Sequence, residues 1–199
     1  MNHFRVIAID LAKSIFQVCL FDQRMKVLSN KRMRRAALLR FLAKQAPALV
    51  AIEACGGAHY WGRVALSLGH QVSMIPPKQV TPYRQGHKTD GKDAVAIGIA
   101  SQQPKLKTVG VKTLEQQSLQ SDKRVQEHLS DHLTATGNML RALVAEFGLV
   151  IPKGVAALRR NMPSILEMAD NGLPDAMRQS LNLAWQQWQY LNEQLEQAE

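Results

Sequence analysis

Cysteine is scarce in this sequence, which has two cysteines, Cys19 and Cys55, among 199 residues. Two are too few for a disulfide framework or a self-contained zinc site, so we expect the protein to reside in a reducing compartment, the cytoplasm. Long apolar runs are also missing, because no segment approaches the ~18 uninterrupted apolar residues that cross a bilayer. The N-terminal segment has no cleavage-site pattern. We therefore predict a soluble protein that is not exported.

Acidic residues are scarce in the first half of the chain. Residues 1–100 hold fifteen Lys and Arg against five Asp and Glu, whereas residues 101–199 hold ten basic and eleven acidic residues. Such an excess of positive charge attracts polyanions, most commonly nucleic acid, because each neutralised phosphate releases condensed counterions. A basic domain with a solvated surface is the alternative on charge alone. The five acids of this half are Asp10, Asp22, Glu53, Asp90 and Asp93.

The order of apolar runs predicts an α/β domain. Short β-rich runs, first close together and then alternating with helical spacing, indicate a mixed sheet that begins as an antiparallel meander and continues with parallel strands. The predicted strands are 4–10, 15–22, 25–32, 49–53 and 71–75. The predicted helices are 34–45, 60–68 and 90–101, the last with Thr89 as its N-cap.

We place a domain boundary at Pro104, which gives a catalytic domain at 1–104 and a helical arm at 105–199. Helical spacing recurs over 113–147 and again over 174–199. The last segment carries an apolar stripe that suits a coiled-coil partner and predicts a homodimer or higher homo-oligomer. A helix packed on its own domain explains the stripe equally well, because the stripe lasts only about three heptads. Its residues are Leu181, Trp185, Trp188, Leu191 and Leu195.

Four of the five scarce acids occupy places from which they can converge. Asp10 and Glu53 each end a predicted strand, and the spacing of Asp90 and Asp93 puts both on one helical face. Four close carboxylates raise one another's pKa unless a cation lies among them. Clusters of oxygen ligands suit Mg²⁺ or Mn²⁺, and two such ions promote phosphodiester displacement. Each acid alone has an ordinary explanation as a turn former, an ion-pair partner or a helix-dipole residue, so the prediction depends on the set.

Basic and aromatic residues near these acids are candidates to contact a phosphate backbone or stack on bases. Most of them belong to the polar, basic segment 78–88, which we expect to be a loop. The candidates are Lys13, Lys78, Tyr83, Arg84, Lys88 and Lys92.

Four segments together resemble the DEDD transposases of the one-ten insertion-sequence family, which are relatives of the pilin-gene invertases. They are IAIDLAKSIFQVCLFD, IEACGG, PPKQVTPYRQGHKTDGKDA and AEFGLVIPKG. The resemblance covers roughly residues 4–160, and the K-T-D-x-x-D-A element is its most specific part. It implies a ribonuclease-H-like fold similar to that of the Holliday-junction resolvase RuvC. It also implies that Asp10, Glu53, Asp90 and Asp93 form the catalytic, metal-binding tetrad.

The resemblance further implies a DNA recombinase that is guided by a structured bridge RNA. In the family, a coiled-coil segment and a separate domain with a nucleophilic serine follow the catalytic domain. This chain ends at Glu199, so we expect a truncated product or a fragment that binds metal, RNA and DNA without completing recombination.

Other functions remain open at this point. The run from Gly86 to Lys92 approaches a phosphate-binding P-loop, but Asp93 replaces the Ser or Thr that would bind Mg²⁺. An actin-like ATPase also begins with an Asp at the end of its first strand, yet it needs a second Gly-rich phosphate loop and about twice this length. A non-catalytic RNA- or DNA-binding module would keep the fold and the basic charge without turnover.

Overall fold

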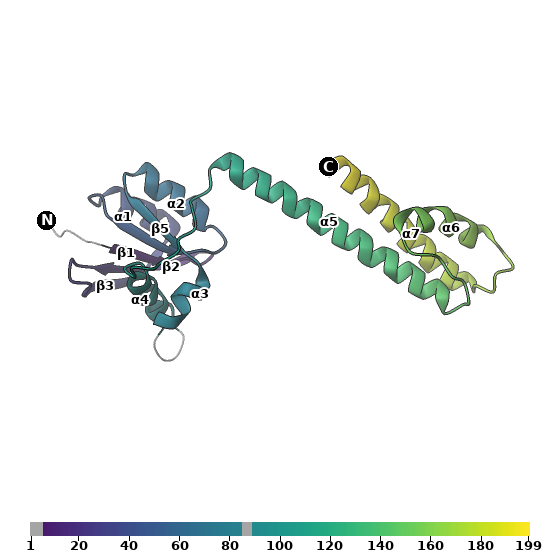
Figure 1. Ribbon diagram of the computed structural model, residues 1–199, viewed down its shortest axis with the longest axis horizontal. Coiled ribbons are helices and arrows are strands. Elements are labelled where there is room, and N and C mark those ends of the chain that lie inside the picture. The colour runs from purple at the N-terminus through teal and green to yellow at the C-terminus, as the bar shows by residue number, and fades with distance from the viewer. Residues whose placement is uncertain (1–5, 85–88) are drawn as a thin grey trace. The chain divides into compact units, whose positions relative to one another are not determined.

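The computed structural model describes residues 6–84 and 89–199. The chain divides into two compact units, Met1–Leu114 and Glu115–Glu199. The first contains all strands of the described sheet, and the second is helical (Figure 1).

The first unit is built on a five-stranded sheet of order β3-β2-β1-β4-β5. Strand β2 runs antiparallel to β1 and β3, whereas β1, β4 and β5 are parallel to one another. This arrangement is the predicted mixed sheet and has the strand order and directions of a ribonuclease-H-like fold. The strands are β1 (Val6–Asp10), β2 (Ile15–Phe21), β3 (Val27–Arg34), β4 (Leu49–Glu53) and β5 (Gln71–Ile75).

Helices cover both faces of this sheet, because alternate strand residues point to opposite sides. In β1, Ile7 and Ile9 belong to one buried cluster with residues of α1 and α2, and Val6 and Ala8 belong to another with residues of α4. Figure 1 shows α1 and α2 on one side of the sheet and α4 on the other. The helices are α1 (Arg35–Ala43), α2 (Ala58–Ser67), α3 (Pro77–Val80) and α4 (Asp90–Ala100), with a 3₁₀ turn η1 (Thr81–Tyr83).

The basic segment after β5 differs from the prediction. Instead of an open loop from residue 78, the chain forms α3 and η1. Pro77 and Pro82 each lie within the first two residues of these short elements, where a proline costs no hydrogen bond because the first N–H groups have no intrahelical partner. The prolines that suggested a loop therefore begin helical turns.

Residues that follow Ala100 continue to pack with the first unit. The Val109 N–H donates to the Met74 carbonyl at 2.8 Å, and the Lys112 N–H donates to His59 Nδ1 at 3.2 Å. The division between the units therefore follows Leu114, beyond the boundary placed at residue 104.

The second unit consists of α5 together with α6 (Val155–Glu167) and α7 (Asp175–Ala198); α5 runs over Leu114–Ala145 and so begins at the end of the first unit. The predicted stripe on α7 is buried among residues of α5 and α6, including Leu140, Leu158 and Met162, except for Leu195, which is partly buried. The rings of Trp185 and Trp188 stack with centroids 5.0 Å apart. The predicted helical region is confirmed, and the stripe packs on its own domain.

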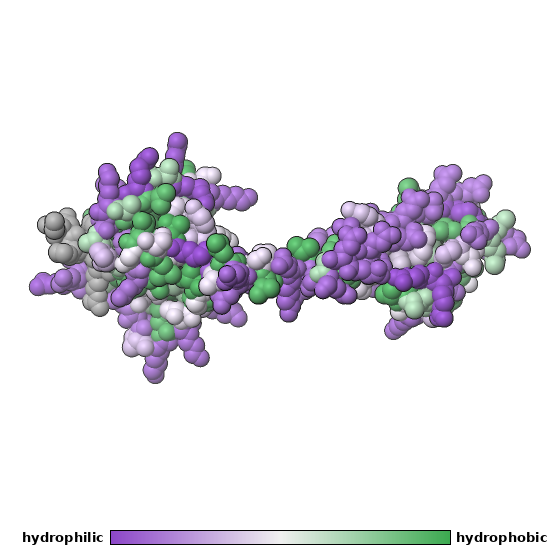
Figure 2. Space-filling view, turned by 90° about the horizontal axis from the view of Figure 1, so that it is seen from above, coloured by the Kyte–Doolittle hydropathy of each residue, from purple (hydrophilic) through white to green (hydrophobic). Residues whose placement is uncertain are grey.

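Hydrophobic side chains gather on the visible face of the first unit, whereas that face of the second unit is mostly hydrophilic (Figure 2). Over residues 6–84 and 89–199, no helix combines the length and the apolar character that a membrane span needs.

Candidate metal centre

Asp10 and Glu53 are the last residues of two neighbouring parallel strands. In the register of β1 and β4, Ile9 pairs with Ile52, so the next residue of each strand lies at the same edge of the sheet. Both side chains are partly buried there. The sheet therefore brings together two carboxylates that are 43 positions apart in the sequence.

The other two acids lie in the first turn of α4. Thr89 caps this helix by accepting a hydrogen bond from the Lys92 N–H, as predicted. Asp93 is buried, and Asp90 is exposed. Carboxylates in a first turn are stabilised by the positive end of the helix dipole. The first turn of α4 thus directs one acid inward and leaves the other at the surface.

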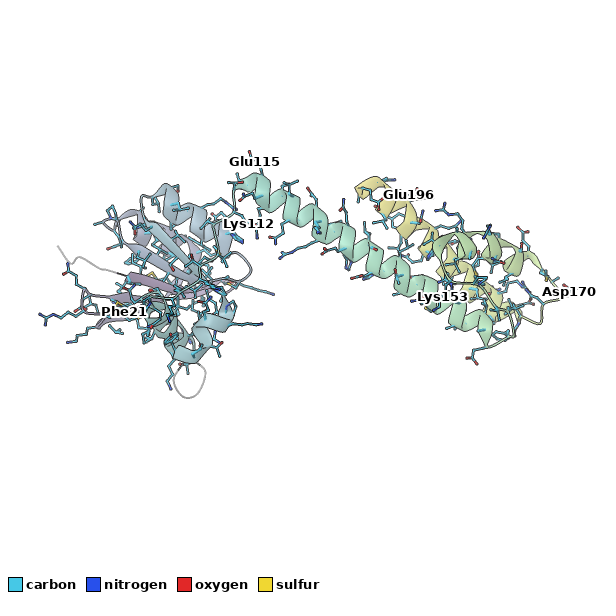
Figure 3. The ribbon with its side chains drawn as sticks, in the orientation of Figure 1. Phe21, Lys112, Glu115, Lys153, Asp170 and Glu196 are labelled. Atoms are coloured by element: carbon cyan, nitrogen blue, oxygen red, sulfur yellow. The ribbon has the colours of Figure 1, made fainter. Side chains whose placement is uncertain are left out.

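Close packing fixes α4 against β2, as the absence of a side chain at Gly98 shows. A Cβ atom built on Gly98 would lie 2.2 Å from Cε2 of Phe21, which is labelled in Figure 3. Polar contacts fix the start of the same helix: the Asn30 side chain on β3 donates to the Gly91 carbonyl at 2.8 Å and accepts from Gln17 on β2 at 2.6 Å. These contacts therefore hold Asp93 in a fixed position relative to the sheet.

Arg84 lies between Glu53 and Asp93. Its Nη2 donates to both carboxylate oxygens of Glu53, at 3.1 and 2.9 Å. Its Nε lies 3.0 Å from Asp93 Oδ1, an ion pair without the alignment of a hydrogen bond. Oδ1 of Asp93 is consequently a buried carboxylate oxygen with no hydrogen-bond partner.

The electrostatic field at this edge is strongly negative. Burial and, to a smaller extent, the charges of Asp93, Glu53 and Asp90 raise the pKa of Asp10 to about 6, while the charge of Arg84 lowers it. Burial, Glu53 and Asp10 also raise the pKa of the nearby Cys55 thiol. The other three predicted acids thus all act on Asp10.

The donor set fits a hard divalent cation such as Mg²⁺ or Mn²⁺, which prefers carboxylate oxygens. Asp93 Oδ1 offers a buried oxygen without a hydrogen bond, and the repulsion around Asp10 would be relieved by positive charge. Within residues 6–84 and 89–199, no three acidic, His or Cys side chains form a ready-made metal-binding group. The guanidinium of Arg84 supplies the positive charge between Glu53 and Asp93 instead.

Asp90 stands apart from the other three acids. Its side chain is 63% exposed and pairs with Arg32 on β3 at 3.3 Å. Neither this pair nor the contacts of Arg84 with the acids were predicted from the sequence.

The predicted nucleic-acid contacts have different surroundings in the structure. Tyr83 is half-buried against the core cluster that Val6 and Ala8 form with α4, and Arg84 faces the acids. Neither side chain therefore extends freely into solvent. Lys88 lies outside the described residues. The exposed candidates are Lys13, Lys78 and Lys92.

Comparisons with known proteins agree with one another. The profile of a DEDD-type, IS110-type transposase family matches residues 7–148, more than half of the chain. A probable family 20 transposase of Pseudomonas aeruginosa is 40% identical over 91% of this chain and 54% of its own length. The transposases for insertion sequence elements IS1111A of Coxiella burnetii and IS1328 of Yersinia enterocolitica are each 34% identical, over 92% and 100% of this chain. The matches cover 50% and 59% of those two proteins, so the chain spans about half the length of these relatives.

Among solved structures, RuvC of Thermus thermophilus matches 52% of this chain and 99% of its own, with a TM-score of 0.41 and 14% identity. The structure of the same protein in complex with a Holliday junction substrate matches 54% of this chain, with a TM-score of 0.38 and 15% identity.

Proposed function

This chain belongs to the DEDD transposases of the IS110 family, and we propose that its first unit is the metal-binding catalytic domain of a DNA transposase. In this proposal Asp10, Glu53, Asp90 and Asp93 hold divalent metal, Mg²⁺ or Mn²⁺. The observation that carries it is the convergence of Asp10, Glu53 and Asp93 at one edge of the sheet in a basic domain, where burial and the neighbouring carboxylates raise the pKa of Asp10. Such a field is costly unless a cation enters it.

The residues contribute in different ways. Asp10 and Glu53 lie on hydrogen-bonded strands, and Asp93 lies on a helix packed on the same sheet, so the backbone that carries the three acids needs little reorganisation to bind an ion. Bound metal would activate the attacking oxygen and stabilise the leaving oxygen of a phosphodiester displacement. The exposed Lys13, Lys78 and Lys92 are suited to bind the DNA backbone near these acids.

The chain spans about half the length of its relatives, so the substrate and partners of the whole transposase are part of the proposal. We propose DNA as the substrate and a structured bridge RNA as the guide. Family membership and the positive charge of residues 1–100 support both. A homo-oligomer through the C-terminal helices remains a prediction, and the buried stripe of α7 does not contribute to it.

Mn²⁺ titration by calorimetry tests the metal site. Asp10→Asn and Asp93→Asn remove one charge each from the acidic edge and are expected to weaken binding at least about tenfold. The matched control is Asp22→Asn, since Asp22 Oδ1 accepts hydrogen bonds from the Arg24 and Lys26 N–H groups and an asparagine oxygen accepts the same bonds.

Two results would contradict the proposal. One is a wild-type chain that shows no heat of Mn²⁺ binding and no metal-dependent rise in melting temperature. The other is a control variant, Asp22→Asn, that loses as much affinity as Asp93→Asn. In the first case a non-catalytic module that binds nucleic acid through its basic surface becomes the better explanation, with Arg84 as a permanent partner of Glu53 and Asp93.

A further inference from the structure

We propose that Arg84 is the internal counter-ion of the acidic edge, holding Glu53 and Asp93 in place when no metal is bound and competing with divalent metal for them. The inference rests on the proposed metal site and adds a residue that the family tetrad does not include. It also changes the role that the sequence suggested for Arg84, from a phosphate contact to a partner of the acids.

The contacts of Arg84 are those of a partly buried counter-ion. Its side chain is 28% exposed, while those of Glu53 and Asp93 are 13% and 6% exposed. Carboxylates so far from solvent need a positive partner, because an unpaired buried charge is strongly unfavourable. One guanidinium contacts both acids, through Nη2 and through Nε.

Arg84 and a metal ion would act on the same charges. Arg84 lowers the pKa of Asp10, while Glu53 and Asp93 raise it, so all of these groups share one electrostatic field. A divalent ion bound to Glu53 and Asp93 would repel a guanidinium at 3 Å from the same oxygens. The two cations therefore exclude each other, and binding of metal requires the guanidinium to leave.

Departure of the guanidinium does not require the backbone to move. The Arg84 N–H donates to the Thr81 carbonyl at 3.2 Å, and Thr81 Oγ1 donates to the Pro77 carbonyl at 2.9 Å, so the main chain is fixed by η1 and α3. Rotation about the side-chain bonds of arginine is sufficient to release both acids. The exchange can thus occur within the folded protein.

Within residues 6–84 and 89–199, the other arginine–acid ion pairs lack these properties. Arg32 reaches Asp90 at 3.3 Å with side chains 71% and 63% exposed. In the second unit, Arg159 reaches Glu196, labelled in Figure 3, at 3.3 Å with side chains 56% and 64% exposed. Exposed ion pairs of this kind contribute little to the stability of the fold. Arg159→Gln therefore makes the same chemical change as Arg84→Gln without touching the acidic edge.

The experiment measures Mn²⁺ dissociation constants by calorimetry and melting temperatures in EDTA and in Mn²⁺, all on the 199-residue chain. Arg84→Gln is expected to lower the dissociation constant on the order of tenfold, because competition with the guanidinium is removed. The same variant should melt at a lower temperature than wild type in EDTA and gain more from Mn²⁺. Arg84→Lys, which keeps the charge but has one ammonium group, should fall between them, and Arg159→Gln should match wild type.

The direction of the change separates this role from a structural one. If Arg84 only shaped the site, its loss would weaken Mn²⁺ binding, so an unchanged or higher dissociation constant for Arg84→Gln overturns the inference. Should Arg84→Gln fail to fold in EDTA, the dissociation constant of Arg84→Lys decides, and a value equal to or above that of wild type overturns it. The inference about Arg84 can fail while the proposed metal site stands, namely if wild type binds Mn²⁺ and Asp93→Asn does not. Absence of binding in all variants overturns both.

Discussion

Gly98 allows α4 to approach the sheet, and replacing it by alanine tests how tightly the helix that carries Asp93 is held. The added Cβ would lie 2.2 Å from Cε2 and 2.5 Å from Cζ of Phe21. Phe21 is 1% exposed and is packed in the core cluster between the sheet and α4, so its ring has no space to move away. The helix or the strand must shift instead.

Two opposing effects determine the size of the change. Ordinary carbon–carbon contacts are about 3.5–4.0 Å, so the clash is severe, and overpacking of a core costs about 1–3 kcal/mol. Alanine is favoured over glycine inside a helix by about 1 kcal/mol. With the clash at the upper end of its range, Gly98→Ala should lower the free energy of unfolding by about 2 kcal/mol.

Urea denaturation followed by circular dichroism measures this difference, and the same helix supplies the control. A Cβ on Gly91 would have Asn30 Nδ2 as its nearest neighbour, at 3.4 Å, so Gly91→Ala should be neutral or stabilising. Adding Phe21→Leu to Gly98→Ala should restore part of the loss, because leucine lacks the ring atoms that clash. A Gly98→Ala chain as stable as wild type, or a double variant with purely additive losses, would refute the packing argument.

Three further predictions follow from buried groups. The pKa of Asp10 is raised from 3.8 to about 6, so deprotonation of Asp10 destabilises the metal-free fold as the pH rises from about 4 to about 6. Asp10→Asn should abolish this part of the pH dependence of the melting temperature in EDTA. Burial raises the pKa of Cys19 to about 11, so a thiol reagent at neutral pH should label the exposed Cys55 first. The charge of Glu53 raises the pKa of the Cys55 thiol, so Mn²⁺ bound to Glu53 should speed the labelling of Cys55. Trp188 is 2% exposed, so Trp188→Ala should destabilise the second unit by about 3–5 kcal/mol, measured as lost helical signal; an unchanged melt would exclude the described packing.

The sheet was largely predictable where strands are apolar and end at strong turn residues. The predictions at 49–53 and 71–75 coincide with β4 and β5. The third strand was placed at 25–32 but spans Val27–Arg34. The turn before it extends to Lys26, because Asp22 accepts hydrogen bonds from two following N–H groups and Met25 adopts a φ of 61°. Such side-chain turns shift a strand's start without changing its composition.

The sequence predicted the acids of the candidate site but not the arginines that pair with them. Strand ends position Asp10 and Glu53, and a capped helix positions Asp93; both rules are local. Arg84 meets Glu53 across 31 positions of sequence, and Arg32 meets Asp90 across 58. An arginine in a basic segment has the same local pattern whether it faces phosphate or a buried carboxylate. Only the packing of η1 beside the sheet distinguishes the two roles.

The stripe of α7 presents the same ambiguity in the second unit. An apolar face with a repeat of three and four residues buries itself equally well against another chain or against a neighbouring helix. The deciding element is α6, which the sequence did not predict because it contains Pro163, a residue unfavourable inside a helix. Once α6 forms, Leu158 and Met162 join the core that buries Trp188. The stripe then has its partner within the chain, so an oligomer of this protein needs a different surface.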